Sequence, residues 1–226
     1  MIYVLIPAAG SGTRMGKGTD KLFMEIGGVP VIERTLQAFS KFSEKHDIRC
    51  IIAAGANKER ITALAASYPF VAMVIEGGPS RTASVTNLVK SLEIYGPKDD
   101  DIVFVHDAAR CLISSEVLER CVKSSKEHEV CVAGVKAKNT IKTVDPSGKV
   151  ISTPDRSSLV EVQTPQCFSY AAIRDAYDNA VKNGIEATDD TALAELIGKE
   201  VYIVEGDYRN IKITTPEDIS FASSLI

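Results

Sequence analysis

The sequence has 226 residues, 45% of them hydrophobic, which suits one large α/β domain with an extensive core. Its net charge is −4, and an acidic balance argues against a nucleic-acid-binding surface. No apolar run has the length of a membrane span, and no basic region precedes the first strand signal. We therefore expect neither a membrane protein nor a signal peptide.

The five cysteines and three histidines show no metal-binding spacing. The cysteines are scattered without a Cys-x-x-Cys pair, and no histidine groups with them. Zinc sites need clustered ligands, whereas unclustered cysteines in odd number are typical of a reducing compartment. The sequence therefore predicts a cytoplasmic protein whose thiols act as small apolar residues.

An apolar strand signal at residues 2–6 leads into a loop of small residues. The loop reads Pro-Ala-Ala-Gly-Ser-Gly-Thr-Arg-Met-Gly and carries Arg14, and Lys21 follows it. Small residues let backbone N–H groups approach a phosphate or a base, and the two cations can neutralise a polyphosphate. The loop fits neither a Walker A motif, which would need Ser or Thr at Gly18, nor a dinucleotide fingerprint, which would need glycine at Met15. A tight turn with two solvated cations stays open as the alternative.

Strand and helix signals then alternate, which predicts a largely parallel sheet covered by helices over residues 1–226. Pro30 can sit in the first turn of a helix whose apolar residues recur every three or four positions up to Phe42. Similar stripes occur at 85–92 and 117–122, and a capping-box pattern at Thr215 opens a C-terminal helix. The further strand signals are 50–54, 71–75, 102–105, 130–135 and 201–204.

The loop after the strand signal at 71–75 contains Gly77, Gly78 and Ser84. The glycines permit a close backbone approach, and the serine offers a hydroxyl. Ligands of open α/β sheets bind outside the carboxyl ends of strands, so this loop is expected to face the same crevice as the first. A helix N-cap with a turn is the alternative.

The strand signal at 102–105 ends in the motif His106-Asp107-Ala-Ala-Arg110. Asp107 can hold magnesium or a ribose hydroxyl, and Arg110 can contact a phosphate or pair with Asp107. His106 is not expected to be a general base, because phosphate monoesters are already anionic nucleophiles at neutral pH. A purely structural ion pair is the alternative.

One segment departs from the alternation of strands and helices. Residues 140–144 and 149–153 are strand signals around a turn with Pro146 and Gly148. An isolated hairpin is marginal in water, so this arm, roughly residues 137–156, is expected to lean on a second subunit. A solvent-exposed meander is the alternative.

The last polar segments are Asp155-Arg156, Thr188-Asp189, which precedes a helix signal, and the neighbourhood of Lys212. Lys212 lies between two isoleucines. We interpret this alternation as the end of a strand whose lysine faces opposite to its neighbours.

Together these motifs resemble the 2-C-methyl-D-erythritol 4-phosphate cytidylyltransferase family, which uses CTP in the non-mevalonate isoprenoid pathway. The resemblance spans nearly the whole chain, and its blocks follow the family order. They are residues 7–15, Gly77-Gly78 with Ser84-Val85, His106 to Arg110, Asp155-Arg156, Thr164-Pro165-Gln166 with Phe168, Thr188-Asp189, and Asn210 to Thr214.

The resemblance implies a Rossmann-like α/β subunit, with a mostly parallel sheet flanked by helices and a projecting β-hairpin arm that is exchanged in a homodimer. It implies transfer of a cytidylyl group from CTP to 2-C-methyl-D-erythritol 4-phosphate, with release of pyrophosphate. The implied cofactor is Mg²⁺ or another divalent cation.

Roles for individual residues also follow from the resemblance. The catalytic cations would be Arg14 and Lys21, acting on the triphosphate, and Arg156 and Lys212, holding the sugar phosphate. The nucleotide-binding set would be Ala8, Ala9, Gly10, Ser11, Gly12, Gly78, Ser84 and Asp107. The substrate-binding set would be Asp107, Arg110, Thr140, Arg156, Thr188 and Lys212, with Thr140 and Arg156 contributed by the partner's arm. Asp107 is also the expected metal ligand.

The chain departs from the family pattern at three positions. Asp20 stands where the family usually has proline before the lysine, and the residue after that lysine is Leu22. Cys111 replaces a proline, and Pro79 replaces an acidic residue.

Two other functions stay open. A cytidylyltransferase for ribitol 5-phosphate or another polyol phosphate would have the same CTP half-site. A catalytically silent nucleotide-binding subunit would keep the fold, although it would not need all four cations.

Overall fold

The computed structural model describes residues 1–10 and 20–226, which contain a seven-stranded sheet flanked by helices. The strands of this sheet are β1 (Ile2–Ala8), β4 (Ile48–Ala54), β5 (Val71–Glu76), β6 (Ile102–Val105), β7 (Val130–Lys136), β10 (Val160–Ser169) and β11 (Tyr202–Glu205). Their order is β11-β7-β10-β6-β1-β4-β5. Neighbours pair in parallel except at β10, which runs antiparallel to both β6 and β7. The predicted mostly parallel sheet is confirmed.

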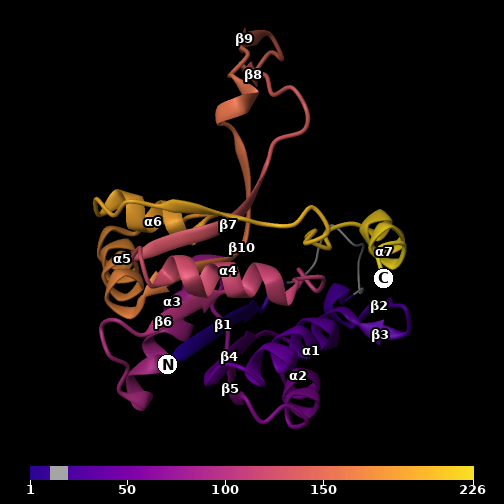
Figure 1. Ribbon diagram of the computed structural model, residues 1–226, viewed down its shortest axis with the longest axis vertical. Helices are drawn as coiled ribbons and strands as arrows, with labels where there is room; N and C mark the ends of the chain where they lie inside the picture. The colour runs from indigo at the N-terminus through magenta and orange to yellow at the C-terminus, as the bar shows by residue number, and fades with distance from the viewer. Residues whose placement is uncertain (11–19) are drawn as a thin grey trace.

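Helices cover both faces of this sheet (Figure 1). One apolar core lies under α1 (Val31–Ser43), α2 (Lys58–Ala65), α4 (Ser115–Ser125) and α7 (Pro216–Ser223). The other lies under α3 (Arg81–Ser91), the 3-10 turn η3 (Leu92–Tyr95), α5 (Tyr170–Asn183) and α6 (Asp190–Leu196).

The strand β1 shows why the sheet is buried on both sides. Val4 and Ile6 point into the first core and Tyr3 and Leu5 into the second, so a continuous apolar run serves two helical layers. Along β1 the register pairs Ile2 with Ile48 of β4 and with Ile102 of β6. The parallel strands therefore bring their carboxyl ends to one edge.

Local signals set the helix starts. Val31 begins α1 directly after Pro30, and Ser80 caps α3 by accepting the Ala83 N–H at 3.0 Å. A capping box opens α7, in which Asp218 accepts the N–H of Thr215 at 2.8 Å. The short hairpin of β2 (Glu25–Ile26) and β3 (Val29–Pro30) turns through two glycines at positive φ.

Several features differ from the sequence-based expectation. The strand β10 and the helices α2 and α5 were not predicted. The strand β10 was missed because it contains polar residues and Pro165, which are unusual within a strand. Pro165 lies where the register between β10 and β7 shifts, between Val162 and Gln166, so its missing N–H breaks no regular ladder hydrogen bond. The expected strand around Lys212 is wrong, because residues 206–215 have no strand structure.

The chain leaves the body between β7 and β10 as an arm (Figure 1). It contains the hairpin of β8 (Thr143–Val144) and β9 (Val150–Ser152), followed by the 3-10 turn η4 (Arg156–Ser158). These strands are shorter than the sequence signals. The turn is held by Asp145, whose carboxylate accepts the N–H groups of Ser147 and Lys149 at 2.9 and 3.0 Å. The arm is therefore locally ordered by its own turn.

Candidate active site

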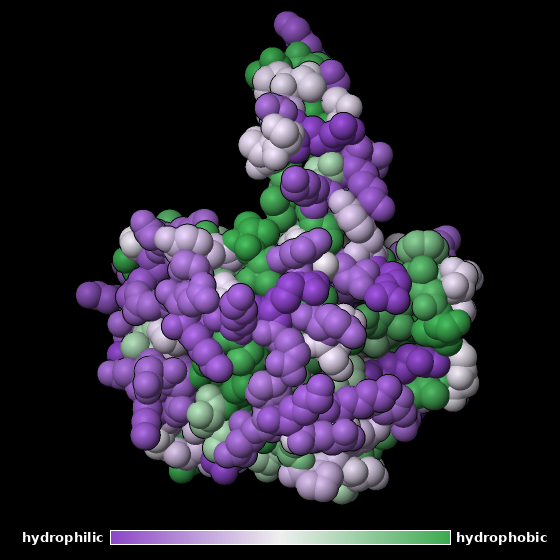
Figure 2. Space-filling view, viewed as in Figure 1, coloured by the Kyte–Doolittle hydropathy of each residue, from purple (hydrophilic) through white to green (hydrophobic). Residues whose placement is uncertain are grey.

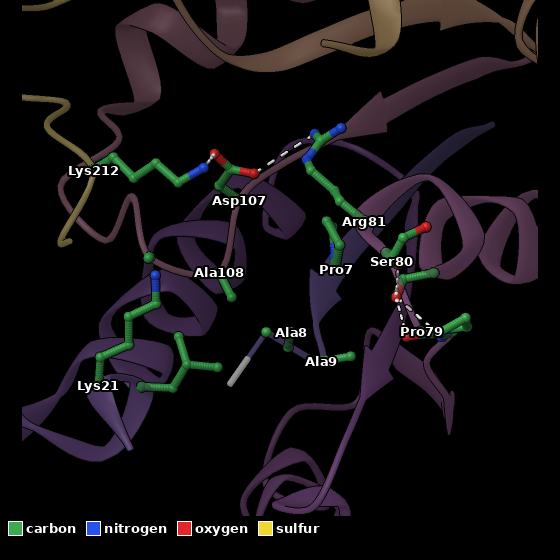
Figure 3. A pocket seen from close by; sticks show the side chains of 15 residues that line it. Pro7, Ala8, Ala9, Lys21, Pro79, Ser80, Arg81, Asp107, Ala108 and Lys212 are labelled. Carbon is green, nitrogen blue, oxygen red and sulfur yellow. Dashed lines mark hydrogen bonds and ion pairs between the residues drawn. The ribbon is translucent and has the colours of Figure 1, made fainter. Parts of the chain in front are cut away.

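A cavity of about 500 Å³ opens at the carboxyl ends of β1, β5 and β6 (Figure 3). This is the crevice that the sequence predicts for ligand binding. Its lining consists of small residues on one side and charged residues on the other. The lining residues are Pro7, Ala8, Ala9, Gly10, Lys21, Leu22, Gly78, Pro79, Ser80, Arg81, Ser84, Asp107, Ala108, Ala109 and Lys212.

Asp107 is the centre of charge in this cavity. The ammonium of Lys212 lies 2.8 Å from its carboxylate, and the guanidinium groups of Arg81 and Arg110 each lie 3.7 Å away. Figure 3 shows Lys212 and Arg81 reaching Asp107 from opposite sides. Burial alone would raise the pKa of Asp107, but Lys212, Arg81 and Arg110 outweigh it and lower the pKa to about 2. The carboxylate is therefore ionised at neutral pH, and the cations around it exceed its charge.

Lys21 joins this charged side from a different part of the chain. It begins the 3-10 turn η2 (Lys21–Phe23), and its ammonium donates to the carbonyl of Ile213 at 3.3 Å. The Ile213 N–H donates in turn to the carbonyl of Ala109 at 2.8 Å. These contacts connect the turn of Lys21, the loop of Asp107 and the segment of Lys212.

The backbone of Asp107 is held by a chain of buried hydrogen bonds. Its N–H donates to Thr164 Oγ1 at 3.1 Å, and Thr164 Oγ1 lies 3.0 Å from His106 Nδ1. His106 Nε2 lies 3.1 Å from the carbonyl of Arg110. A carbonyl only accepts, so Nε2 carries the proton and Thr164 donates its hydroxyl proton to Nδ1. Both ring nitrogens of His106 are thus engaged within the protein.

The loop after β5 lies closely against the end of β1. A Cβ atom added to Gly77 would overlap the methyl of Ala9, and one on Gly78 would come within 2.8 Å of the Ala83 backbone. Ser84 accepts the Gly78 N–H at 3.0 Å and donates to the carbonyl of Ser80 at 2.8 Å. The hydroxyl predicted to bind nucleotide therefore also fixes the shape of the loop.

The structure brings together Ala8, Ala9, Gly10, Lys21, Gly78, Ser84, Asp107 and Lys212 around the cavity. Arg110 lies behind Asp107 and donates to the carbonyl of Asn210 at 2.8 Å. Thr140, Arg156 and Thr188 are exposed and are absent from the lining of this cavity. Ser11, Gly12 and Arg14 lie outside the described residues.

Arg81 was missed by the sequence reasoning, which treated its segment as a turn and a helix cap. Its two terminal nitrogens each lie 2.6 Å from an oxygen of Asp190, whose carboxylate also accepts the hydroxyl of Tyr177. One signal was available. A cation in the first turn of a helix opposes the helix dipole, so Arg81 at the start of α3 needs a partner or a function.

Comparison with known proteins identifies the family. A family model described as IspD, 2-C-methyl-D-erythritol 4-phosphate cytidylyltransferase, matches residues 2–226. The chain belongs to this family. A member from Clostridium perfringens (strain SM101) is 39% identical over 226 residues, covering 100% of this chain and 98% of that protein. A member from Symbiobacterium thermophilum is 40% identical over 225 residues, covering 100% and 92%.

Solved structures of this cytidylyltransferase family have the same fold. The 4-diphosphocytidyl-2C-methyl-D-erythritol synthase of Anaerococcus prevotii superposes with a TM-score of 0.83 at 29% identity, covering 99% of this chain and 97% of that one. The Thermus thermophilus cytidylyltransferase gives 0.78 at 29% identity, covering 98% and 97%. Within residues 1–10 and 20–226, no helix is both long and apolar enough to cross a membrane.

The described residues do not form a magnesium cage of their own. Mg²⁺ prefers several oxygen ligands, and Asp107 is the one carboxylate among the described lining residues. Lys212 already pairs with it directly. No group of three or more His, Cys, Asp or Glu side chains in the described part of the chain is placed to hold a metal. The described residues therefore offer no second carboxylate that could bind a metal together with Asp107.

Cys111, the departure that follows Arg110, is buried, and burial raises the pKa of its thiol to about 11. It is protonated at neutral pH, as expected for a cysteine that acts as a small apolar residue.

The environment of His106 predicts acid sensitivity. Burial lowers the pKa of His106 to about 4, against 6.5 for the free side chain. The folded protein thus binds fewer protons than the unfolded chain between these values, so the free energy of unfolding should fall by about 3 kcal/mol as the pH drops from 6.5 to 4. Urea unfolding at a series of pH values measures this slope.

His106→Gln, which removes the buried imidazole, should flatten that slope. A wild-type free energy that stays constant across the window would contradict the assignment of His106 as a buried neutral group.

Removing Arg81 should destabilise the fold, because it leaves the fully buried carboxylate of Asp190 without its cation. We expect Arg81→Ala to lower the free energy of unfolding by about 3–5 kcal/mol. Arg174→Ala, which breaks an exposed pair with Asp99, should cost at most about 1 kcal/mol. Adding Asp190→Leu to Arg81→Met should recover part of the loss, and equal losses for Arg81→Ala and Arg174→Ala would contradict this account.

Proposed function

We propose that this chain transfers the cytidylyl group of CTP to 2-C-methyl-D-erythritol 4-phosphate and releases pyrophosphate. The observation that carries the proposal is the cation cluster around Asp107, in a cavity at the carboxyl ends of β1, β5 and β6. Two polyanions must meet in this reaction, and an excess of fixed cations offsets their repulsion. Relatives that match the whole chain are named for this activity.

In this proposal, a phosphate oxygen of the sugar phosphate attacks the α-phosphorus of CTP in line. A bond forms between that oxygen and the α-phosphorus, and the bond from the α-phosphorus to the oxygen that bridges to the β-phosphorus breaks. Pyrophosphate leaves with the electron pair. No proton has to be abstracted, which agrees with the engagement of both nitrogens of His106 in protein hydrogen bonds.

The cavity lining suggests which residues bind the nucleoside, the triphosphate and the sugar phosphate. Ala8, Ala9 and Gly10 leave space for the nucleoside, and a Cβ added to Gly10 would meet no described atom within 4 Å. Lys21, with Arg14 from outside the described residues, is assigned to the triphosphate. Lys212 is assigned to the sugar phosphate, and Asp107 orients it between the two substrates.

Magnesium enters this scheme as part of the nucleotide substrate. The triphosphate of CTP supplies the oxygen ligands that Mg²⁺ prefers, and the protein then needs few of its own. When bound, the ion would neutralise phosphate charge, while the protein's own residues hold and orient the two substrates.

We further propose a homodimer that exchanges the arm. Arm residues Ile141, Val144, Val150 and Ile151 are each 42–65% exposed, which leaves apolar side chains available for a second subunit. Figure 2 shows this apolar surface on the arm among polar residues. Arg156 borders a hollow at the arm instead of its own catalytic cavity, so its substrate role requires the partner's cavity.

Residues 1–226 are proposed to work as one nucleotidyltransferase domain in the cytoplasm. Two cores share one sheet, and the five cysteines are buried and free, as suits a reducing compartment. The family does not favour the ribitol 5-phosphate alternative or a silent subunit. Pyrophosphate release with CTP and Mg²⁺ tests all three readings, because methylerythritol 4-phosphate, ribitol 5-phosphate or neither would support turnover.

Replacing Lys21 should remove charge stabilisation that develops in the transition state. We expect Lys21→Ala to lower kcat about 10²–10³-fold with a smaller change in KM for CTP. Lys90→Ala, at an exposed lysine of α3, serves as the matched control and should keep wild-type rates. Wild-type turnover of Lys21→Ala at saturating CTP would exclude the proposed role.

The arm exchange predicts complementation between two inactive variants. Co-expressed subunits carrying Lys21→Ala and Arg156→Ala should form mixed dimers in which one site has a wild-type Lys21 and receives a wild-type Arg156. Random pairing should restore about a quarter of wild-type activity, measured on tag-purified mixtures. If Arg156 acted within its own subunit, every site would lack one cation and mixing would restore nothing.

A further inference from the structure

The turn η2, which carries Lys21, is anchored to the start of the helix α2. Asp20, directly before Lys21, accepts the N–H of Leu22 at 3.1 Å through one carboxylate oxygen. Its other oxygen accepts the side-chain amide of Asn57 at 3.0 Å. The guanidinium of Arg60 lies 3.7 Å from the ring centroid of Phe23, in the same turn. Both outer contacts come from the start of α2.

The side chain of Asn57 contacts Asp20 and does not cap its own helix. It occupies the N-cap position of α2, where asparagine normally accepts a helix N–H, yet its side chain makes no cap hydrogen bond. Its Oδ1 atom is buried without a hydrogen-bond partner among the described residues. A lost cap generally costs about 1 kcal/mol, so α2 begins in a less stable way while Asn57 ties Asp20. Local rules are commonly broken in this way at functional sites.

The hydrogen bond between Asn57 and Asp20 restricts the position of Lys21, the next residue. Lysine has a long flexible stem, and fixing it in a productive position before the substrate binds removes an ordering cost from the reaction. Leu22 is buried, and Lys21 donates to Ile213 on its far side, so the turn is held from both ends once Asp20 is fixed.

We propose that Asp20 and Asn57 are positioning residues for catalysis, and that their hydrogen bond sets the place of Lys21 over the triphosphate. The inference rests on the proposed function, in which Lys21 acts on CTP. Asp20 and Asn57 touch neither substrate. Their effect is expected on kcat, through Lys21.

The test is a double-mutant cycle with Asp20→Ala and Asn57→Ala, following kcat, KM for CTP and the thermal midpoint. Each single variant should lower kcat about 10- to 100-fold, and the double variant should be no slower than the slower single one, because one shared contact is lost. Thr62→Ala removes a hydrogen bond within α2 that does not reach the turn, and it should keep wild-type kcat.

An exchange of the two side chains provides a rescue. In Asp20→Asn with Asn57→Asp, the new amide donates to the new carboxylate, and the new Oδ1 still accepts the Leu22 N–H. The exchanged pair should recover most of kcat, whereas Asn57→Asp alone places two carboxylates together and should be slow. Additive losses in the cycle, or failure of the exchange to recover any rate in a folded protein, would overturn the proposal.

The Lys21→Ala background separates this inference from the proposed function. If Asp20 acts through Lys21, Asp20→Ala should cause no further loss of kcat there. Wild-type kcat in Lys21→Ala would refute the role of Lys21 itself. Slow Lys21→Ala together with wild-type kcat in Asp20→Ala and Asn57→Ala would refute only the positioning role, even if both variants melted at lower temperature.

Discussion

The ionised carboxylate of Asp107 is the constraint on which the cavity depends. Lys212 contacts it directly, and Arg81 and Arg110 lie near it, so segments from three parts of the chain meet at one side chain. Without this anion, the cations would repel one another across a partly dehydrated cavity. With it, they stay in place and still carry surplus positive charge. A polyanion that binds here meets cations that are already in place, so little rearrangement is needed during the reaction.

The antiparallel strand β10 makes this arrangement possible. Its Thr164 accepts the N–H of Asp107, and its Gln166 accepts the backbone N–H groups of Asp190 and Thr191 at 2.7 and 3.1 Å. Its Gln163 donates to the carbonyl of Asp207 at 2.8 Å. One strand thus supports the loop of Asp107, the start of α6 and the segment that leads to Lys212. A strand that makes these hydrogen bonds needs polar side chains. The strand β10 therefore lacks the apolar run by which the other strands were predicted.

Local pattern sufficed for much of the fold. Apolar runs marked β1, β4, β5, β6, β7 and β11, and small residues after β1 and β5 marked the cavity. Pairings between distant residues were not predictable. Arg81 and Asp190 are 109 positions apart, and Thr164 is 58 positions from His106. No periodicity connects such pairs.

The fixed charge of Asp107 also bears on the enzyme's response to acidity. With a pKa of about 2 for Asp107 and about 4 for His106, neither group changes its protonation between pH 5 and 8. A phosphate monoester does so, because its second ionisation has a pKa of about 6. The terminal phosphate of CTP also titrates near this range, so the rate is expected to follow the protonation of both substrates. The charge of Asp107 stays fixed while the substrates bring the titrating groups from solution.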